Sequence, residues 1–239
     1  MGQFLARGVS VTTSFDYVSF DNEPGADLNT PRFWEGDPTE STLRTPTWVK
    51  TPNVTVRDIR PEQDKYYFSK DGFQLLGIPT AHSPHPDHQD EVQAYLGETA
   101  AHVRKLLNAS QAFVFDYRVI RSPASPEELS WARGPGNARR TFHKTPCCAW
   151  RPLNLPVEDM PLALCAFPSL DLSDVASSHF HGGPGYIAET YVLRHNKNQK
   201  WVWFGQQRPD ELLVFKNFDS EPGNSPRCEF HTFAILKTS

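Results

Sequence analysis

The sequence predicts a mainly β fold with one or two helices, in a single domain of 239 residues. Aromatic residues make up 12% of the chain and there are 21 prolines, which favours a turn-rich β fold over a helical bundle. Strand-like runs, separated by turn residues, cover 147–151, 161–167, 186–194, 200–204, 210–218 and 227–236. Strands of this number and spacing predict a sandwich, a jelly roll or a barrel.

The N-terminal part, residues 1–65, is polar and is interrupted by prolines every few residues. We expect short strands at Val9–Val18 and Val54–Ile59. They are predicted to belong to an arm that wraps a core formed by residues 66–239, and not to a separate domain.

The core is predicted to begin with strand material at Tyr66–Ser69 and Phe73–Ile78. A helix is expected at about 90–108, with Asp90 or an earlier Asp as its N-cap. Its apolar stripe consists of Val92, Leu96, Val103, Leu106 and Leu107. After the helix, Ala112–Ile120 has the β-branched and aromatic residues that are typical of a strand.

Composition excludes several classes of protein. The net charge is −4 and no basic stripe stands out, so nucleic acid is not an expected partner. No window approaches the roughly 18 apolar residues of a membrane span, and the N-terminus lacks the apolar region of a secretory signal. The four cysteines are therefore expected to be reduced thiols in a cytoplasmic protein. The oligomeric state does not follow from the sequence.

Three blocks of sequence carry a resemblance to a known family. The first is Trp-Arg-Pro-Leu at 150–153, followed by 157–165. The second is His-Asn-Lys-Asn-Gln-Lys-Trp-Val-Trp-Phe at 195–204. The third, at 210–220, begins Asp-Glu-Leu-Leu-Val-Phe-Lys and is followed by a histidine-bearing segment at 227–232. In this order the blocks resemble the fungal AsaB-type hydroxylase/desaturase family, over roughly residues 50–235.

The resemblance implies a double-stranded β-helix core of the jelly-roll or cupin kind, either complete or incomplete. It also implies an oxidoreductase that hydroxylates or desaturates a small molecule in fungal secondary metabolism. Fe(II) and 2-oxoglutarate are the cofactors that the resemblance implies. Such chemistry needs two histidines and one carboxylate on one face of the iron, and a cation, usually Arg, for the distal carboxylate of 2-oxoglutarate.

Two positions depart from the family pattern. The distal metal histidine corresponds to His231, but the interval that should hold the proximal His-x-Asp contains a single histidine, His143, with Thr145 two residues later. The family also carries an arginine after its distal histidine, and none follows His231 in this sequence. We therefore expect both the His-x-Asp metal motif and the C-terminal arginine to be missing.

His231 and His143 are the predicted catalytic residues. His231 is either a surviving metal ligand of an incomplete site, or a general acid or base in the same pocket. The alternative is a hydrogen-bonded histidine of the β core. His143 is what remains at the proximal position, and alone it completes only a two-ligand site with His231.

Arg151, Arg227 and Trp203 are the predicted substrate-binding residues. A buried arginine needs an anionic partner, so Arg151 either binds a substrate carboxylate or pairs with Asp159 or Glu158. Arg227 lies four residues before His231, on the same side of a predicted strand, and would orient substrate or line the barrel mouth. Trp203 shares a strand face with Trp201, and either stacks on a ligand or belongs to the core.

The His-x-Asp sequence His88-Gln89-Asp90 precedes the predicted helix. We interpret it as a solvated loop with a helix cap, since this spacing chelates only on a strand. His82, His85 and His88 recur every three residues, and adventitious metal binding explains them better than a designed site. Cys147 and Cys148 are adjacent, so they should face opposite sides of a strand and not chelate together.

Two other functions stay open besides the oxidoreductase. One is a metal-free isomerase, cyclase or dehydratase of the same kind of pathway, which would use His231, His143 and a carboxylate such as Asp116 or Asp219 for proton transfer. The other is a catalytically inactive or truncated member of the family. The expected partner in each enzymatic case is a small-molecule substrate.

Overall fold

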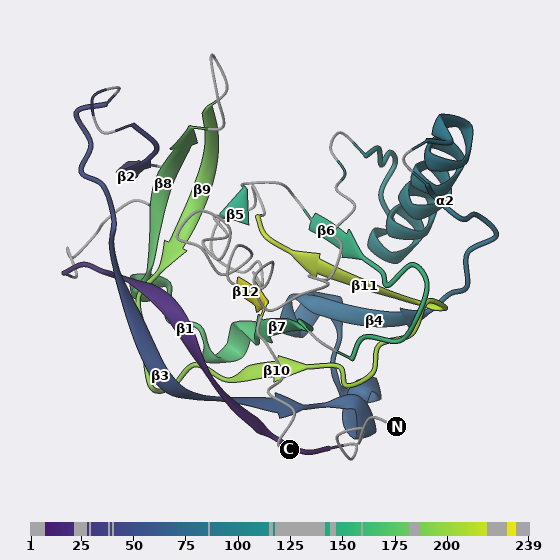
Figure 1. Cartoon of the computed structure of the whole chain (residues 1–239), viewed down its shortest axis with the longest axis horizontal. Coiled ribbons are helices and arrows are strands. Elements are labelled where there is room, and N and C mark those ends of the chain that lie inside the picture. Colours follow the sequence, from purple (N-terminus) through teal and green to yellow (C-terminus); the bar gives the residue numbers. More distant parts are fainter. Residues whose placement is uncertain are drawn as a thin grey trace.

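The protein folds around three β-sheets, and one long helix lies against one of them (Figure 1). The structure is a computed structural model, and it describes residues 8–21, 28, 30–37, 39, 41–85, 87–114, 117, 142–143, 147–158, 160–181, 187–218 and 229–232. Within these residues strands far outnumber helices, which confirms the predicted mainly β fold.

The largest sheet has five strands in the order β1-β3-β10-β7-β12. Its members are β1 (Val11–Ser19), β3 (Thr47–Asp58), β10 (Trp201–Trp203), β7 (Leu162–Cys165) and β12 (Glu229–Thr232). All its pairings are antiparallel except that of β3 with β10. The early residues of the chain are therefore hydrogen-bonded directly to strands from its later half.

The described residues also form two smaller sheets. The four-stranded sheet has the order β2-β8-β9-β5, and the three-stranded sheet has the order β4-β11-β6. The strands of the first are β2 (Pro31–Glu35), β8 (Val175–His181), β9 (Ile187–Leu193) and β5 (Phe142–His143). Those of the second are β4 (Phe73–Gly77), β11 (Glu211–Lys216) and β6 (Cys147–Trp150).

Both faces of the five-stranded sheet contribute to core clusters, although much of β3 is exposed. One face packs against β8 and β9 through the first core cluster, which includes Tyr17, Ala163, Tyr191, Trp201 and Trp203. The other face packs against the three-stranded sheet through a second cluster, to which Ile59, Phe73, Leu164, Phe204 and Leu213 belong. Alternate residues of a strand face opposite sides, so neighbouring residues of β7 belong to different clusters.

The long helix α2 (Gln89–Leu107) confirms the helix predicted at about 90–108. It buries Val92, Thr99 and Val103, and Val103 packs on Leu212 and Val214 of β11. The prediction of its N-cap was wrong, because His88 holds the cap position and makes no side-chain hydrogen bond there.

Two predicted strands differ from the structure. Tyr66–Ser69 is not a strand, since Phe68–Asp71 forms one helical turn, α1, that closes on Gly72 in the left-handed conformation. Gly72 has a φ of 83°, a value that glycine adopts without steric cost. In the predicted strand Ala112–Ile120, residues 112–114 and Tyr117 are not in a strand, and the remaining residues lie outside the described part of the chain.

In the described part of the chain, 3₁₀ turns at Arg60–Lys65, Phe167–Ser169 and Leu172–Asp174 connect strands. The first follows β3 and is anchored by the carboxylate of Asp58, which accepts hydrogen bonds from the amides of Arg60 and Gly205. Asp58 also accepts from the amide of Gly8. One buried side chain therefore joins three segments that are distant in the sequence.

Candidate functional site

The first core cluster contains polar atoms among its aromatic rings. The Tyr17 ring meets the Trp201 ring edge-on at 6.4 Å and that of His195 at 5.0 Å. Burial raises the pKa of the Tyr17 phenol well above its ordinary value, and a hydrogen bond with Trp201 opposes part of this rise. The phenol therefore remains neutral near physiological pH and can both donate and accept hydrogen bonds.

His231 lies in β12, where its backbone is in register with Ala163 of β7. The side chain of Ala163 is fully buried in the first core cluster. Trp203, a predicted substrate-binding residue, is 2% exposed and belongs to the same cluster. His231 and Trp203 are therefore in the same sheet, in β12 and β10, and β7 lies between these two strands.

His143 lies in β5, where its backbone is in register with Thr190 of β9. The Thr190 hydroxyl donates to the carbonyl oxygen of Ser178 at 3.1 Å and to Glu35 Oε1 at 3.4 Å. The partner of His143 therefore belongs to a polar group in the four-stranded sheet, and the partner of His231 belongs to the first core cluster. The two predicted catalytic positions are in different sheets.

Arg151 follows β6 and is 7% exposed. Its Nη1 donates to two carbonyl oxygens, that of Ile78 at 2.7 Å and that of Pro209 at 2.8 Å. Within the described residues its guanidinium has no carboxylate hydrogen-bond partner, and its Nε has no partner at all. The contacts of Arg151 thus join the loop after β4 to the loop before β11. A pair with Glu158 is not formed, while Asp159 lies outside the described residues.

The other predicted polar residues of the site, Arg227, Asp116 and Asp219, lie outside the described residues.

The His-x-Asp sequence at 88–90 spans the start of α2. His88 is the N-cap residue and Asp90 lies in the first turn, so the pair is not on a strand, where residues two apart share a face. His82 and His85 instead lie near carboxylates, with His82 Nδ1 3.5 Å from Glu91 Oε2 and His85 Nδ1 3.4 Å from Asp87 Oδ2. Across the described part of the chain, no three His, Cys, Asp or Glu residues gather as metal ligands.

Cys147 and Cys148 face different clusters, as predicted. Cys147 packs beside α2 on the outer side of β6, and Cys148 packs in the second core cluster. Burial raises the pKa of the Cys147 thiol to about 11. Cys148 Sγ lies 3.0 Å from Asn217 Nδ2. Neither arrangement resembles the electropositive, exposed setting of a reactive thiolate.

The third block of sequence, which begins at Asp210, contributes a buried ion pair that was not foreseen. Glu211 is 4% exposed and accepts two hydrogen bonds from Arg60, at 2.6 and 2.9 Å. Its Oε2 also accepts from the amide of Arg208 at 2.8 Å. The sequence shows two adjacent acidic residues, Asp210 and Glu211, but it does not identify the partner, because Arg60 lies 151 residues away.

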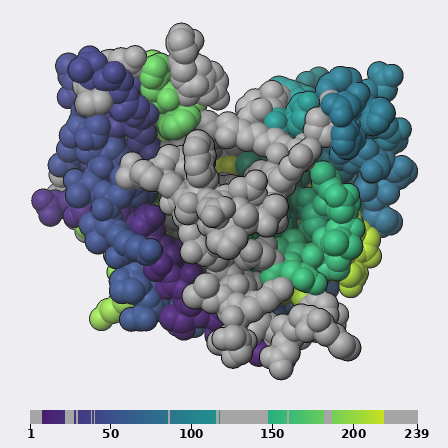
Figure 2. Space-filling model, in the orientation of Figure 1, coloured from purple at the N-terminus to yellow at the C-terminus, as the bar shows by residue number. Residues whose placement is uncertain are grey.

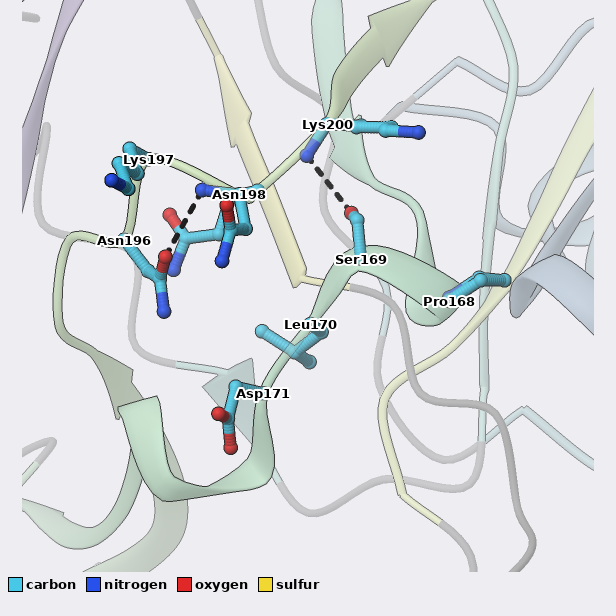
Figure 3. Close-up of a pocket in the computed structure, with 9 residues that line it drawn as sticks. Pro168, Ser169, Leu170, Asp171, Asn196, Lys197, Asn198 and Lys200 are labelled. Carbon is cyan, nitrogen blue, oxygen red and sulfur yellow. Dashed lines mark hydrogen bonds between the residues drawn. The ribbon is translucent and has the colours of Figure 1, made fainter.

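Part of the second block of sequence, residues 196–200, lines one side of a surface pocket of about 630 Å³ (Figure 3). Residues 168–171 line the other side. The Lys200 amide donates to Ser169 Oγ at 2.8 Å, and the Asn198 amide donates to Asn196 Oδ1 at 3.0 Å. These bonds fix the turn between β9 and β10. None of the predicted site residues lines this pocket.

Among the described residues, no helix is both long enough and apolar enough to cross a bilayer.

Comparison with known proteins gives a consistent assignment. A family model described as an oxidoreductase/YMDC permease-like domain matches residues 18–147 and 146–238. The alpha-ketoglutarate-dependent dioxygenase tstK of Talaromyces stipitatus is 27% identical over 206 residues, which cover 72% of this chain and 73% of tstK. The Fe(II)/2-oxoglutarate-dependent dioxygenase nvfI of Aspergillus novofumigatus is 29% identical over 223 residues, 77% of each chain.

A third relative, the hydroxylase/desaturase efuI of Hormonema carpetanum, is 22% identical over 229 residues, 77% of each chain. Among solved structures, the iron and alpha-ketoglutarate-dependent endoperoxidase NvfI superposes with a TM-score of 0.64 at 20% identity, covering 94% of this chain and 90% of NvfI. A second NvfI structure with a different conformation gives a TM-score of 0.65 at 21% identity, covering 96% and 92%. The shared fold confirms the predicted double-stranded β-helix.

Proposed function

Since the chain belongs to the oxidoreductase/YMDC permease-like family, which includes the fungal hydroxylase/desaturase enzymes, we propose that it is an oxidoreductase acting on a small molecule of secondary metabolism. The observation that carries this proposal is the match to tstK, nvfI and efuI, each across more than 70% of both chains. A shared fold alone would support it less, because one fold hosts many chemistries.

The names of these relatives point to Fe(II) and 2-oxoglutarate as cofactors. A facial triad needs two histidines and a carboxylate that converge from strands. Here one His-x-Asp, at 88–90, occupies the start of a helix, and another, that of His85 and Asp87, lies in the loop before it. No three potential ligands gather in the described residues. The described residues therefore do not fit the iron, and we derive no catalytic step through it.

A second candidate function would use the same residues without a metal. A metal-free isomerase, cyclase or dehydratase would need only proton transfer within the barrel. His231 would serve as one acid or base, with His143 or a carboxylate such as Asp116 or Asp219 as its counterpart. Trp203 would form part of the apolar wall. Arg151 and Arg227 would orient the substrate under either function.

Metal binding distinguishes the two functions. The purified chain would be titrated anaerobically with Mn(II) as a stable surrogate for Fe(II), by calorimetry, with and without 2-oxoglutarate. The oxidoreductase predicts one site of micromolar affinity that His231→Ala abolishes. His88→Ala is the matched control, because it removes the histidine of the helical His-x-Asp and should leave binding unchanged.

Absence of binding by a cooperatively folding chain would refute an iron oxygenase and direct the search to proton-transfer chemistry. Loss of binding in His88→Ala with retention in His231→Ala would refute the assignment of His231.

A further inference from the structure

A row of paired side chains runs along the strands β8 and β9, on the face that packs against the first core cluster. Directly opposed residues of antiparallel strands share a face, as do alternate residues of one strand. The row consists of the pairs Val175–Leu193, Ser177–Tyr191, His179–Glu189 and His181–Ile187. Val175, Tyr191 and Leu193 belong to the first core cluster, so the other members of the row face the same way.

Ser177 is the unusual member of this row. It is 1% exposed, and among the described residues its Oγ has no hydrogen-bond partner. The adjacent Ser178, which faces the other side of β8, is equally buried, but its Oγ donates to Glu35 Oε1 at 2.8 Å and lies 3.3 Å from the Phe33 carbonyl oxygen. Buried hydroxyls are nearly always hydrogen-bonded. The hydroxyl of Ser177 therefore has an unused capacity to donate and to accept.

Exposure increases along the row from Ser177 towards one end of the strands. The pair Ser177–Tyr191 is buried, whereas His179 is half-buried and Glu189 is exposed. Ile187, at the end of the row, is 56% exposed. Figure 2 shows that the surface is hollowed between this end of the strands and α2. Ser177 thus lies at the boundary between the exposed end of this row and the packed core.

The wall beside the row is aromatic. Trp34 of β2 is in register with His179. Its ring meets His179 edge-on at 6.4 Å and stacks on His181 at 5.7 Å, with 20° between the planes. A wall of this kind suits a flat, apolar molecule, and the hydroxyl at its inner end suits an oxygen atom on that molecule.

We propose that Ser177 is a substrate-binding residue that recognises a hydroxyl or carbonyl oxygen on an apolar, ring-containing small molecule. This inference rests on the proposed function and specifies its substrate class. The oxygen approaches Ser177 from the end of the row that bears His179 and Glu189, and the rings lie along Tyr191 and Trp34. The serine hydroxyl donates to a carbonyl oxygen, or accepts from a hydroxyl.

The test compares 2-naphthol with naphthalene, which differ by one hydroxyl, by fluorescence titration of the full chain without metal or cofactor. The wild type should bind 2-naphthol about three- to tenfold more tightly than naphthalene, the usual gain from one buried hydrogen bond. Ser177→Ala should reduce this ratio to about one. Ser178→Ala is the matched control and should keep the ratio.

Thermal unfolding adds a second readout. Ser177→Ala removes no hydrogen bond and should leave the Tm unchanged, whereas Ser178→Ala should lower it by about 3–8 °C. If Ser178→Ala does not fold, the exposed Ser173 replaces it as the control position. Three results would overturn the proposal: an unchanged ratio in Ser177→Ala, a wild type that binds neither probe or shows no preference, or a Tm loss in Ser177→Ala equal to that of Ser178→Ala. Because no turnover is needed, each of them is separate from a failure of the metal titration.

Discussion

Replacing Glu211 with glutamine should destabilise the protein strongly, because it breaks a buried ion pair and leaves the partner charge in place. The side chains of Arg60 and Glu211 are 9% and 5% exposed, and two hydrogen bonds join them. Breaking a buried pair by removing one charge costs about 3–5 kcal/mol. Arg60 keeps hydrogen bonds to the Gly205 carbonyl oxygen and to Gln63 Oε1, so we expect the lower end, about 3 kcal/mol.

Urea titration followed by tryptophan fluorescence measures this loss. For a chain of this size the denaturant slope is about 3 kcal/mol per M, so the midpoint should fall by about 1 M. Asp210→Asn provides the control, because Asp210 is exposed and pairs with Arg208 in solvent, where ion pairs contribute little. A midpoint that falls by less than about 0.3 M in Glu211→Gln, or equally in both variants, would refute this reasoning.

Three further substitutions or measurements test the remaining polar contacts. Gly205→Ala would place a Cβ 2.5 Å from Asp58 Oδ2 and displace the carboxylate from its amide donors, so the same urea titration should show a loss of about 2–4 kcal/mol; a wild-type midpoint would contradict it. Arg151→Gln should cost about 1–3 kcal/mol through the lost carbonyl contacts, and no loss would indicate that Arg151 serves a ligand instead. Burial raises the pKa of Cys147 to about 11. An unfolded thiol ionises first as the pH rises, so folding stability from this group should fall between about pH 9 and 11. Stability that is flat over that range in the wild type, and identical in Cys147→Ala, would refute it.

Strands with a strong apolar run were predictable from the sequence. Glu211–Lys216 and Ile187–Leu193 were expected within one or two residues of their observed bounds, since β-branched and large apolar residues report burial on both faces. In contrast, Val175–His181 was not predicted. Its sequence is Val-Ala-Ser-Ser-His-Phe-His, with a single β-branched residue. Its extended conformation is therefore determined by pairing with the two neighbouring strands, and not by the β propensity of its residues.

The candidate site depended on long-range pairing that no local pattern encodes. The expectation that Arg151 is buried was correct, but its partners are two carbonyl oxygens and not the carboxylates that a buried arginine suggests. The unpartnered Ser177 was invisible in the sequence, because Ser177 and Ser178 are identical residues that only the strand register distinguishes. His231 was correctly expected in a strand, whereas the strand that contains His143 was not predicted. The roles of both histidines stay predictions.

In the described residues, the sequence blocks that carry the family resemblance make contacts that stabilise the fold. Arg151 joins two loops, Glu211 neutralises Arg60, and Trp201 packs against Tyr17. A substitution at such a position costs stability whatever reaction the protein performs, so selection for folding alone would retain these blocks. The His-x-Asp motif contributes to chemistry and not to packing, and none of the strands in the described residues contains it. These blocks therefore determine the fold of this protein, whereas its reaction depends on the side chains that line the barrel.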